Sequence, residues 1–477
     1  MRFVNCATDP AGERSVATQP ARARRRDRIA VQRPVRFRYH LGDAPARPDA
    51  HPGGITMTRH IVAVGLLCLL AAGCNSSDAR TAGGNGLLPG RLERIDSAIE
   101  QAIDDGRIAG AVALVRRDGQ TVYHEAFGSA DLASGAAMRT DSIFRIASMT
   151  KAITSVAVMQ LYERGDFRLG DPVGDYLPEF AEMQVIETID DDGLVTATRP
   201  AEEPIRIIHL LTHTSGIAYP FMAGQLDRTY RDAGIIDGLT TQPLTLAAQM
   251  ELLAAQPLLF EPGERFNYGL NTDVLGRLVE VVSGQPLDEY FAEHVTGPLG
   301  MRDTHFYLPD ASAERLVRLY AYDAERGLVA PEEVIADIAI DEQDYPVTGA
   351  RSYFSGGAGL SSTASDYARF TSMLLNEGEL DGARILSRKS VELMRAPRVD
   401  SDGDGDPEIG LGFWIVTDLG DYGALGSEGA YSWGGAFYTS YWIDPAENLT
   451  AVFMAQVYPA DTDIAERFRT LVYQALE

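Results

Sequence analysis

The sequence predicts an α/β fold of the α+β type, with one antiparallel sheet built from both chain ends, flanking helices and a mostly helical inserted lobe. Three observations support this. A helical pattern and two β-prone runs open the domain, and β-prone runs and a helical pattern close it. Between them, residues 171–400 alternate helical stretches with Gly, Pro and Asp punctuation. No repeat of fixed period interrupts this order, which excludes a solenoid or propeller.

The opening elements are a helix, two strands and a second helix. The first helix is predicted because apolar residues recur at helical spacing before Gly106, at Leu92, Ile95, Ile99 and Ile103. Residues 111–115 and 120–127 predict two antiparallel strands, because Asp118-Gly119 between them is a hairpin signal. The second helix stops at Gly165 and is lined by Ile153, Val156, Ala157, Gln160 and Leu161.

The closing elements are three strands and a helix. Residues 411–417, 430–444 and 449–457 predict the strands, the last two joined around 445–448, and 462–476 predict the final helix. These elements complete the sheet that the opening strands begin.

Length and charge restrict the kind of protein. A chain of 477 residues exceeds what one compact core usually holds, so we expect two lobes or one enlarged domain. The formal charge of -26 repels the phosphates of nucleic acids, which excludes nucleic acid as a partner. From Asn75 onward the acids number 63 and the basic residues 30, which predicts a strongly acidic, solvated surface.

The N-terminal residues predict export rather than folded structure. Residues 1–56 hold eleven Arg, no Lys and five acids without hydrophobic periodicity, which predicts a disordered or untranslated extension. Residues 57–74 are typical of a bacterial lipoprotein signal peptide, because a basic start and a short apolar run lead through Gly73 into Cys74. Lipidated Cys74 would anchor the protein to the cell envelope, periplasm-facing, as its only membrane link; the alternative is an unmodified Cys74. Residues 75–90 then form a flexible tether, and 91–477 the folded domain.

Cysteine chemistry is excluded from the folded domain. Every cysteine lies at or before Cys74, so no disulfide, cysteine-rich zinc site or cysteine nucleophile can form in the domain.

A serine and a lysine carry the strongest chemical signal. In Ser148-Met149-Thr150-Lys151 at the start of a helix, hydroxyl and amine share one face, close enough to hydrogen-bond. Of the 42 basic residues only Lys151 and Lys389 are lysines. This composition matters because a lysine can give up its proton and an arginine cannot. Ser-x-x-Lys alone is a weak motif, since a capped helix with a surface lysine has the same spacing.

Further motifs in the same order identify a family resemblance. Residues 144–151, 210–216 (Leu-Leu-Thr-His-Thr-Ser-Gly) and 298–301 (Pro-Leu-Gly-Met), with Tyr268 and a Trp433-Gly434-Gly435 strand, resemble the serine β-lactamase and penicillin-recognising superfamily. They are most similar to its family VIII carboxylesterases, from about Leu92 to Leu476. The resemblance implies the β-lactamase/transpeptidase-like fold, Ser148 as nucleophile, Lys151 and Tyr268 as acid/base groups, and the backbone N–H groups of Ser148 and Ala436 as oxyanion hole.

Two departures from the family pattern favour a neutral ester as substrate. Relatives that cleave β-lactams usually have Tyr-x-Asn, whereas Tyr268-Gly269-Leu270 places Asn271 one residue late. Where those relatives carry a strand cation, Trp433 offers an apolar ring. Gly434 and Gly435 leave room for substrate along the strand edge, or pack the sheet closely. Tyr219 is a candidate for the acyl pocket or the core.

The predicted reaction is acyl transfer through Ser148. Either Lys151 takes the serine proton, which requires a neutral amine, or a charged Lys151 holds Tyr268 as the phenolate that takes it. The sequence leaves two alternative functions open. One is a β-lactamase or D-amino-acid peptidase, and the other is a catalytically inactive envelope binding module.

Other motifs indicate neither a metal nor a cofactor. His209 and His213 have helical zinc spacing, but no Glu follows His209, so we expect packing roles. Residues 400–406 begin like a calcium loop, but the twelfth position is Leu411, which favours a solvated turn. No Gly-x-Ser-x-Gly occurs, and no nucleotide-binding motif lies between a strand and a helix, so no cofactor is expected.

Overall fold

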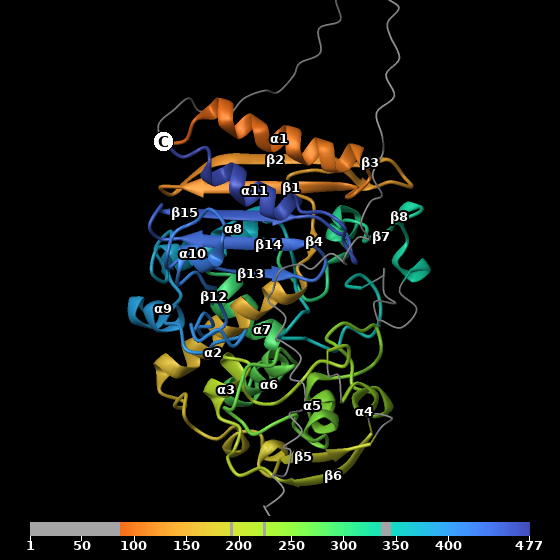
Figure 1. Ribbon diagram of the computed structural model, residues 1–477, viewed down its shortest axis with the longest axis vertical. Coiled ribbons are helices and arrows are strands. Elements are labelled where there is room, and N and C mark those ends of the chain that lie inside the picture. The colour runs from red at the N-terminus through yellow and green to blue at the C-terminus, as the bar shows by residue number, and fades with distance from the viewer. Residues whose placement is uncertain (1–85, 191–193, 223–225, 335–344) are drawn as a thin grey trace, which may run out of the picture.

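The computed structural model describes residues 86–190, 194–222, 226–334 and 345–477, and a seven-stranded antiparallel sheet organises them (Figure 1). Its strand order is β12-β13-β14-β15-β1-β2-β3, so strands from both ends of this range meet at β15 and β1. Its members are β1 (Gly110–Arg117), β2 (Gln120–Asp131), β3 (Ala136–Ala137), β12 (Trp414–Ile415), β13 (Tyr431–Gly435), β14 (Thr439–Asp444) and β15 (Leu449–Met454). The predicted α+β fold with a sheet from both chain ends is confirmed.

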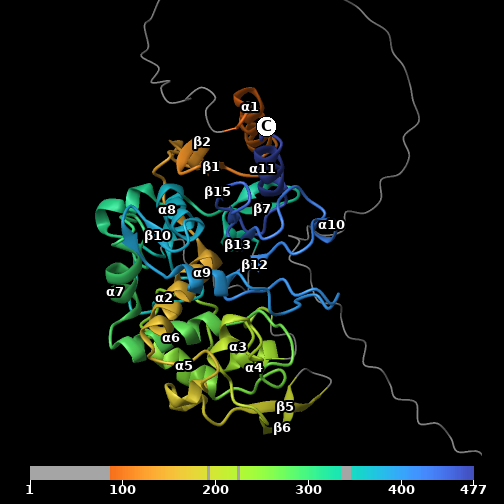
Figure 2. The same cartoon turned by 90° about the vertical axis from the view of Figure 1, so that its left-hand side faces the viewer.

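Alternating side chains of the central strands enter two separate hydrophobic cores. Ala111, Ala113 and Val115 face helices α1 (Pro89–Asp104) and α11 (Ile464–Tyr473), which pack against each other. Val112 and Leu114 enter the larger core, which also contains side chains of α8 (Ala364–Leu375) and α2 (Thr150–Arg164). The turned view separates α1 and α11 on one side of the sheet from α8 on the other (Figure 2).

The inserted lobe is mostly helical, as predicted, but it also contains an unpredicted hairpin (Figure 1). The expected bounds of 171–400 are too wide, because α8, within that range, packs against β14 and β15 of the sheet. Its helices and strands are β5 (Gln184–Ile189), β6 (Val195–Pro200), α3 (Ile207–Leu211), α4 (Asp227–Asp232), α5 (Leu246–Ala254), α6 (Asn271–Ser283) and α7 (Leu287–Phe291). Smaller elements complete the described chain: β4 (Phe144–Arg145), β7 (Ala321–Asp323), β8 (Gly327–Val329), β9 (Ser361–Ser362), β10 (Glu379–Leu380), β11 (Ala383–Arg384), α9 (Arg388–Met394) and α10 (Leu419–Tyr422). Among the helices of the described residues, none has the length and apolarity needed to cross a membrane.

Several predicted boundaries differ from the structure. The single strand expected over 430–444 is wrong. The chain reverses between Gly435 and Thr439, which lie opposite each other, and the segments on either side form the two paired strands β13 and β14. Buried Phe437 and Tyr438 in that turn conceal it, since apolar side chains continue the strand pattern. Helix α1 begins at Pro89, two residues before the expected domain start. The expected extension (1–56), the signal with Cys74 (57–74) and tether residues 75–85 lie outside the described residues.

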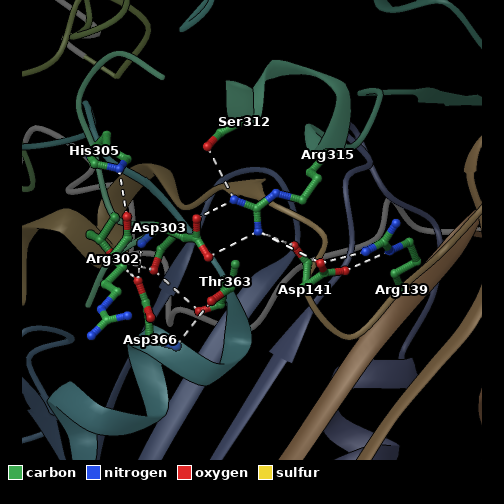
Figure 3. Close-up of polar contacts among 11 residues, drawn as sticks. Arg139, Asp141, Arg302, Asp303, His305, Ser312, Arg315, Thr363 and Asp366 are labelled. Carbon is green, nitrogen blue, oxygen red and sulfur yellow. Dashed lines mark hydrogen bonds and ion pairs between the residues drawn. The ribbon is translucent and has the colours of Figure 1, made fainter. Parts of the chain in front are cut away.

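A polar network fixes the segment that leads into β4 (Figure 3). The Arg315 guanidinium donates to the Asp141 carbonyl (3.2 Å) and the Ser312 hydroxyl (3.2 Å) and forms an ion pair with Asp303 (3.0 Å to Oδ2). The Asp303 N–H in turn donates to Asp366 (2.7 Å). Residues 303–315 are thereby tied to the chain immediately before β4 on one side and to α8 on the other.

We expect Arg315→Ala to lower the free energy of unfolding by about 2 kcal/mol, because a charged donor with three partners is lost. Arg139 is the matched control: it pairs with Asp141 through two short contacts but its side chain is 67% exposed to solvent, so Arg139→Ala should lower the free energy of unfolding clearly less than Arg315→Ala. Urea denaturation measures both, and equal losses would contradict the structural role of Arg315.

Candidate active site

The chain presents Ser148 at the junction of strand and helix. After β4, Ala147 adopts a left-handed conformation (φ 42°), which is strained for a residue with a side chain and turns the backbone into α2. Between Ser142 and Met159, Ser148 is half-buried and every other residue is buried. The turn therefore leaves the hydroxyl of Ser148 accessible to a substrate.

The structure brings the three expected reacting groups together. The Lys151 Nζ lies 3.1 Å from the Ser148 Oγ, and the Tyr268 hydroxyl lies 2.8 Å from the same oxygen. Lys151 is 2% exposed and also donates to the Tyr219 hydroxyl (2.9 Å) and to the Gly357 carbonyl (2.8 Å). The serine hydroxyl thus has two hydrogen-bond partners suited to proton transfer.

Aromatic rings surround the Tyr268 side chain. Its ring centroid lies 4.8 Å from that of His213, 5.3 Å from Tyr219 and 5.8 Å from Trp433. Tyr219 is 2% exposed, as Lys151 is, and its hydroxyl contacts the Lys151 Nζ, so its role in the acyl pocket stays a prediction. Its stacked neighbour Phe221, 5.0 Å away, is 49% exposed and adds apolar surface beside it.

His213 supports this aromatic group as a neutral imidazole. It lies beyond the end of α3 with φ 54°, so the expectation that it shares a helix with His209 is wrong. Burial, with the nearby charge of Lys151, holds the pKa of His213 well below its usual range. The Asn271 amide donates to its Nδ1 (3.1 Å), and the Asn271 side-chain oxygen accepts from Ser215 (2.5 Å). The displaced Asn271 therefore holds His213, which stacks on Trp433.

The strand carrying Trp433, Gly434 and Gly435 lies against the nucleophile turn. A Cβ at Gly435 would be 2.3 Å from the Ile146 carbonyl oxygen and 2.3 Å from the Thr439 hydroxyl. This close packing accounts for the missing side chain at position 435. It also fixes Ala436, the next residue, relative to the segment that carries Ser148.

We expect Gly435→Ala to reduce kcat/KM for the reaction at Ser148 about 100-fold. The new methyl group would overlap the Ile146 carbonyl oxygen, and relieving that overlap moves the end of β13 away from Ser148 by a sizeable fraction of an ångström. Gly170→Ala is the control, since nothing lies within 4 Å of a Cβ there. Steady-state kinetics and a melting curve are measured for both. Unchanged kcat/KM in a folded Gly435→Ala variant would contradict the packing argument.

The Asp-rich loop forms the expected turn. Asp400 accepts backbone N–H groups of Gly403 (2.6 Å) and Gly405 (2.9 Å), while Ser401 donates its N–H to Glu408 (3.0 Å). The same turn brings carboxylate oxygens of Asp400, Asp402 and Glu408 within 4.8 Å of one another.

The fold and the Ser148-Lys151-Tyr268 arrangement define a serine hydrolase. The chain belongs to the beta-lactamase family, whose profile matches residues 95–474. It is 34% identical over 375 residues to Esterase EstB of Burkholderia gladioli, covering 76% of this chain and 89% of that protein. It is 35% identical over 382 residues to Protein Rv1367c of Mycobacterium tuberculosis (strain ATCC 25618 / H37Rv), covering 77% and 90% respectively.

A solved structure confirms the resemblance to the esterase branch of the family. The hydrolase EstCE1, described as having promiscuous acyltransferase activity, is 29% identical and superimposes with a TM-score of 0.65 over 81% of this chain and 98% of its own. The chain is therefore an esterase-related serine hydrolase with the β-lactamase fold.

Proposed function

We propose that this enzyme hydrolyses neutral carboxylic esters through an acyl-enzyme on Ser148. The observation that carries the proposal is the Ser148 hydroxyl within hydrogen-bond distance of both Lys151 (3.1 Å) and Tyr268 (2.8 Å). Ser148 attacks the ester carbonyl while one of these groups takes its proton. The oxyanion is held by the backbone N–H groups of Ser148 and Ala436, the alcohol leaves with a returned proton, and water then attacks the acyl-enzyme.

The surroundings of Ser148 favour a substrate without charge. Half-buried Trp433, next to Tyr268, and exposed Phe221, next to Tyr219, offer apolar surface beside the reacting groups. Lys151 already donates to three oxygens, so it is occupied and cannot dock a substrate carboxylate. The similar protein EstB is named an esterase, and EstCE1 is described as a hydrolase, which supports ester cleavage by this chain.

The test is a substrate comparison on purified protein. We expect turnover of p-nitrophenyl acetate and butyrate, loss of that turnover in Ser148→Ala, and no hydrolysis of a chromogenic cephalosporin. Fast cephalosporin hydrolysis would favour a β-lactamase instead. No turnover of any substrate, together with no labelling of Ser148 by a fluorophosphonate, would favour the inactive binding module.

We also propose that the enzyme works in the bacterial envelope, periplasm-facing and anchored by a lipid on Cys74. The proposal depends on the apolar run that ends at Gly73-Cys74. Metabolic labelling with a radioactive fatty acid should mark the wild-type protein and leave Cys74→Ala unlabelled. Equal labelling of the two proteins would refute the anchor.

A further inference from the structure

A carboxylate that the proposed mechanism does not use lies beside the active site, at Asp237. The next residue, Gly238, packs tightly against a loop of the site, since a Cβ built on it would lie 2.9 Å from the Ser355 Oγ. Two residues further along that loop, the Gly357 carbonyl accepts a hydrogen bond from Lys151 (2.8 Å). Asp237 is therefore held next to a loop that contacts the reacting groups.

A small apolar cluster begins two residues after this carboxylate, at Leu239. The cluster consists of buried Ala147, Leu319 and Phe437, with half-buried Leu239 and Tyr458 packed against them. Ala147 directly precedes Ser148 in the chain. Phe437 directly follows Ala436, whose backbone N–H is expected in the oxyanion hole. The cluster therefore adjoins the place where the ester carbonyl would bind.

Tyr458 adds a phenol beside the same cluster. Its ring centroid lies 6.4 Å from that of Phe437. Burial raises the pKa of Tyr458, and the charge of Asp237 raises it further, because the carboxylate is near the phenol. Burial also raises the pKa of Tyr219, to which Asp237 contributes, and the Tyr219 hydroxyl contacts Lys151 (2.9 Å). The carboxylate is therefore near both the Tyr458 phenol and the tyrosine that contacts the active-site lysine.

Neither polar group has a partner elsewhere in the described part of the chain. There, the Asp237 carboxylate meets no donor except its own backbone N–H, and no hydrogen bond reaches the Tyr458 hydroxyl. Both side chains are half-buried, and burial raises the pKa of Asp237 to about 6, so at pH 7 it is mainly a carboxylate. A substrate that covers these groups removes them from water, so it must supply the hydrogen bonds that they lose.

The course of β13 and the turn after it assigns these groups to one end of the ester. Trp433 lies next to Tyr268, with 5.8 Å between ring centroids, whereas Phe437, four residues later, lies next to Tyr458. Ala436 lies between the two aromatic residues in the chain. In the proposed function the leaving alcohol receives a proton from the groups at the Trp433 end. The acyl chain then extends toward Phe437.

We propose that Asp237 and Tyr458 form a polar subsite that selects esters with a hydroxyl group on the acyl chain. The substrate hydroxyl donates its hydrogen to the Asp237 carboxylate, and its oxygen accepts the hydrogen of the Tyr458 phenol. An ammonium could donate to the carboxylate, but its nitrogen has no lone pair for the phenol. The orientation of the ester in this subsite rests on the proposed function.

Ester pairs that differ only in the hydroxyl test the subsite. Methyl hydroxybutanoate and methyl hydroxyhexanoate, with the hydroxyl on the third and on the last carbon respectively, are compared with esters in which a methyl group replaces it. Released acid is titrated at constant pH. We expect at least one hydroxy ester to have kcat/KM about tenfold above its methyl partner, because it gains a hydrogen bond to a charged group. Equal kcat/KM within both pairs would overturn the proposal.

Variants of the two residues locate the preference. Asp237→Leu removes the acceptor and keeps a similar size, so the preference for the hydroxy ester should disappear while the methyl partner is still hydrolysed. Asp237→Ala removes the same acceptor and replaces the leucine variant if a melting curve shows that it does not fold. Tyr458→Phe keeps the ring beside Phe437 and should lower the preference about threefold. A preference that survives in both folded variants would overturn the subsite.

Asp232 provides the matched control. It is the last residue of α4, pairs with Arg228 (3.6 Å) and has a side chain that is 69% exposed. Asp232→Leu removes the same charge from the same lobe, so it should keep the wild-type preference for the hydroxy ester. An equal loss of preference in this variant would assign the effect to overall charge and overturn the role of Asp237.

Two further measurements separate the subsite from the proposed function. A preference for hydroxyethyl butanoate over propyl butanoate that Asp237→Leu abolishes would overturn the placement of the hydroxyl on the acyl chain. If wild-type protein hydrolyses no ester, the proposed function fails, and calorimetric titration of Ser148→Ala protein with the same ester pairs decides the subsite. There the hydroxy ester should bind about tenfold more tightly than its methyl partner, and equal Kd values in both pairs would refute the subsite.

Discussion

Replacing Tyr268 with phenylalanine is expected to reduce kcat/KM for p-nitrophenyl esters by about 10²- to 10⁴-fold, the range typical of losing an acid/base group. The hydroxyl that lies 2.8 Å from the Ser148 Oγ is removed. The ring stays, and with it the contacts to His213, Tyr219 and Trp433, so the variant should keep its fold. Steady-state kinetics with a thermal melting curve measure the two effects separately.

Tyr219→Phe is the matched control for this experiment. Its hydroxyl contacts Lys151 (2.9 Å), and no contact joins it to the Ser148 Oγ in the structure of the described residues. Losing one of the three oxygens around the Lys151 Nζ should reduce kcat/KM only about tenfold. If Tyr219→Phe lost more activity than Tyr268→Phe, proton transfer through Tyr268 would be refuted.

Hydrophobic periodicity was enough to predict most of the sheet and helices α1, α2 and α11, but not α8, which packs on the sheet although it lies within the residues expected to form the lobe. The β1–β2 hairpin follows from Asp118-Gly119, and α2 ends at Gly165 in the left-handed conformation that glycine adopts most easily. The hairpin β5–β6 was missed because it lies in the lobe among helical patterns. The reversal after Gly435 was missed because Phe437 and Tyr438, in the turn itself, continue the apolar pattern of a strand.

The candidate site was predictable where chemistry depends on neighbours in sequence. Ser148 and Lys151 are one helical turn apart, whereas Tyr268 needed the family resemblance because its distance from Ser148 in the chain carries no geometric information. Gly357, whose carbonyl accepts a hydrogen bond from Lys151, was missed entirely. Paired glycines at 356–357 were the available signal, since such pairs often mark a close backbone approach. Nothing in the sequence showed that the approach was to a lysine.

Lys151→Arg should reduce ester turnover about as severely as Lys151→Ala, by roughly 10³-fold. The lysine places one nitrogen at hydrogen-bond distance from Ser148, Tyr219 and Gly357, in a site where its side chain is 2% exposed. A guanidinium is larger and planar, so its donors cannot converge on three oxygens arranged around a single point. It also cannot release a proton at any stage of the reaction.

The second lysine makes this experiment specific. Lys389 pairs with Glu392 (2.6 Å) on the surface, where a guanidinium fits as well as an ammonium, so Lys389→Arg should retain wild-type kcat/KM. Charge is preserved in both variants, and only the geometry and proton affinity at position 151 differ. Near wild-type turnover in Lys151→Arg would therefore show that a positive charge alone suffices beside Ser148. That result would show that the reaction needs neither the arrangement of three oxygens around the Lys151 nitrogen nor proton transfer by Lys151.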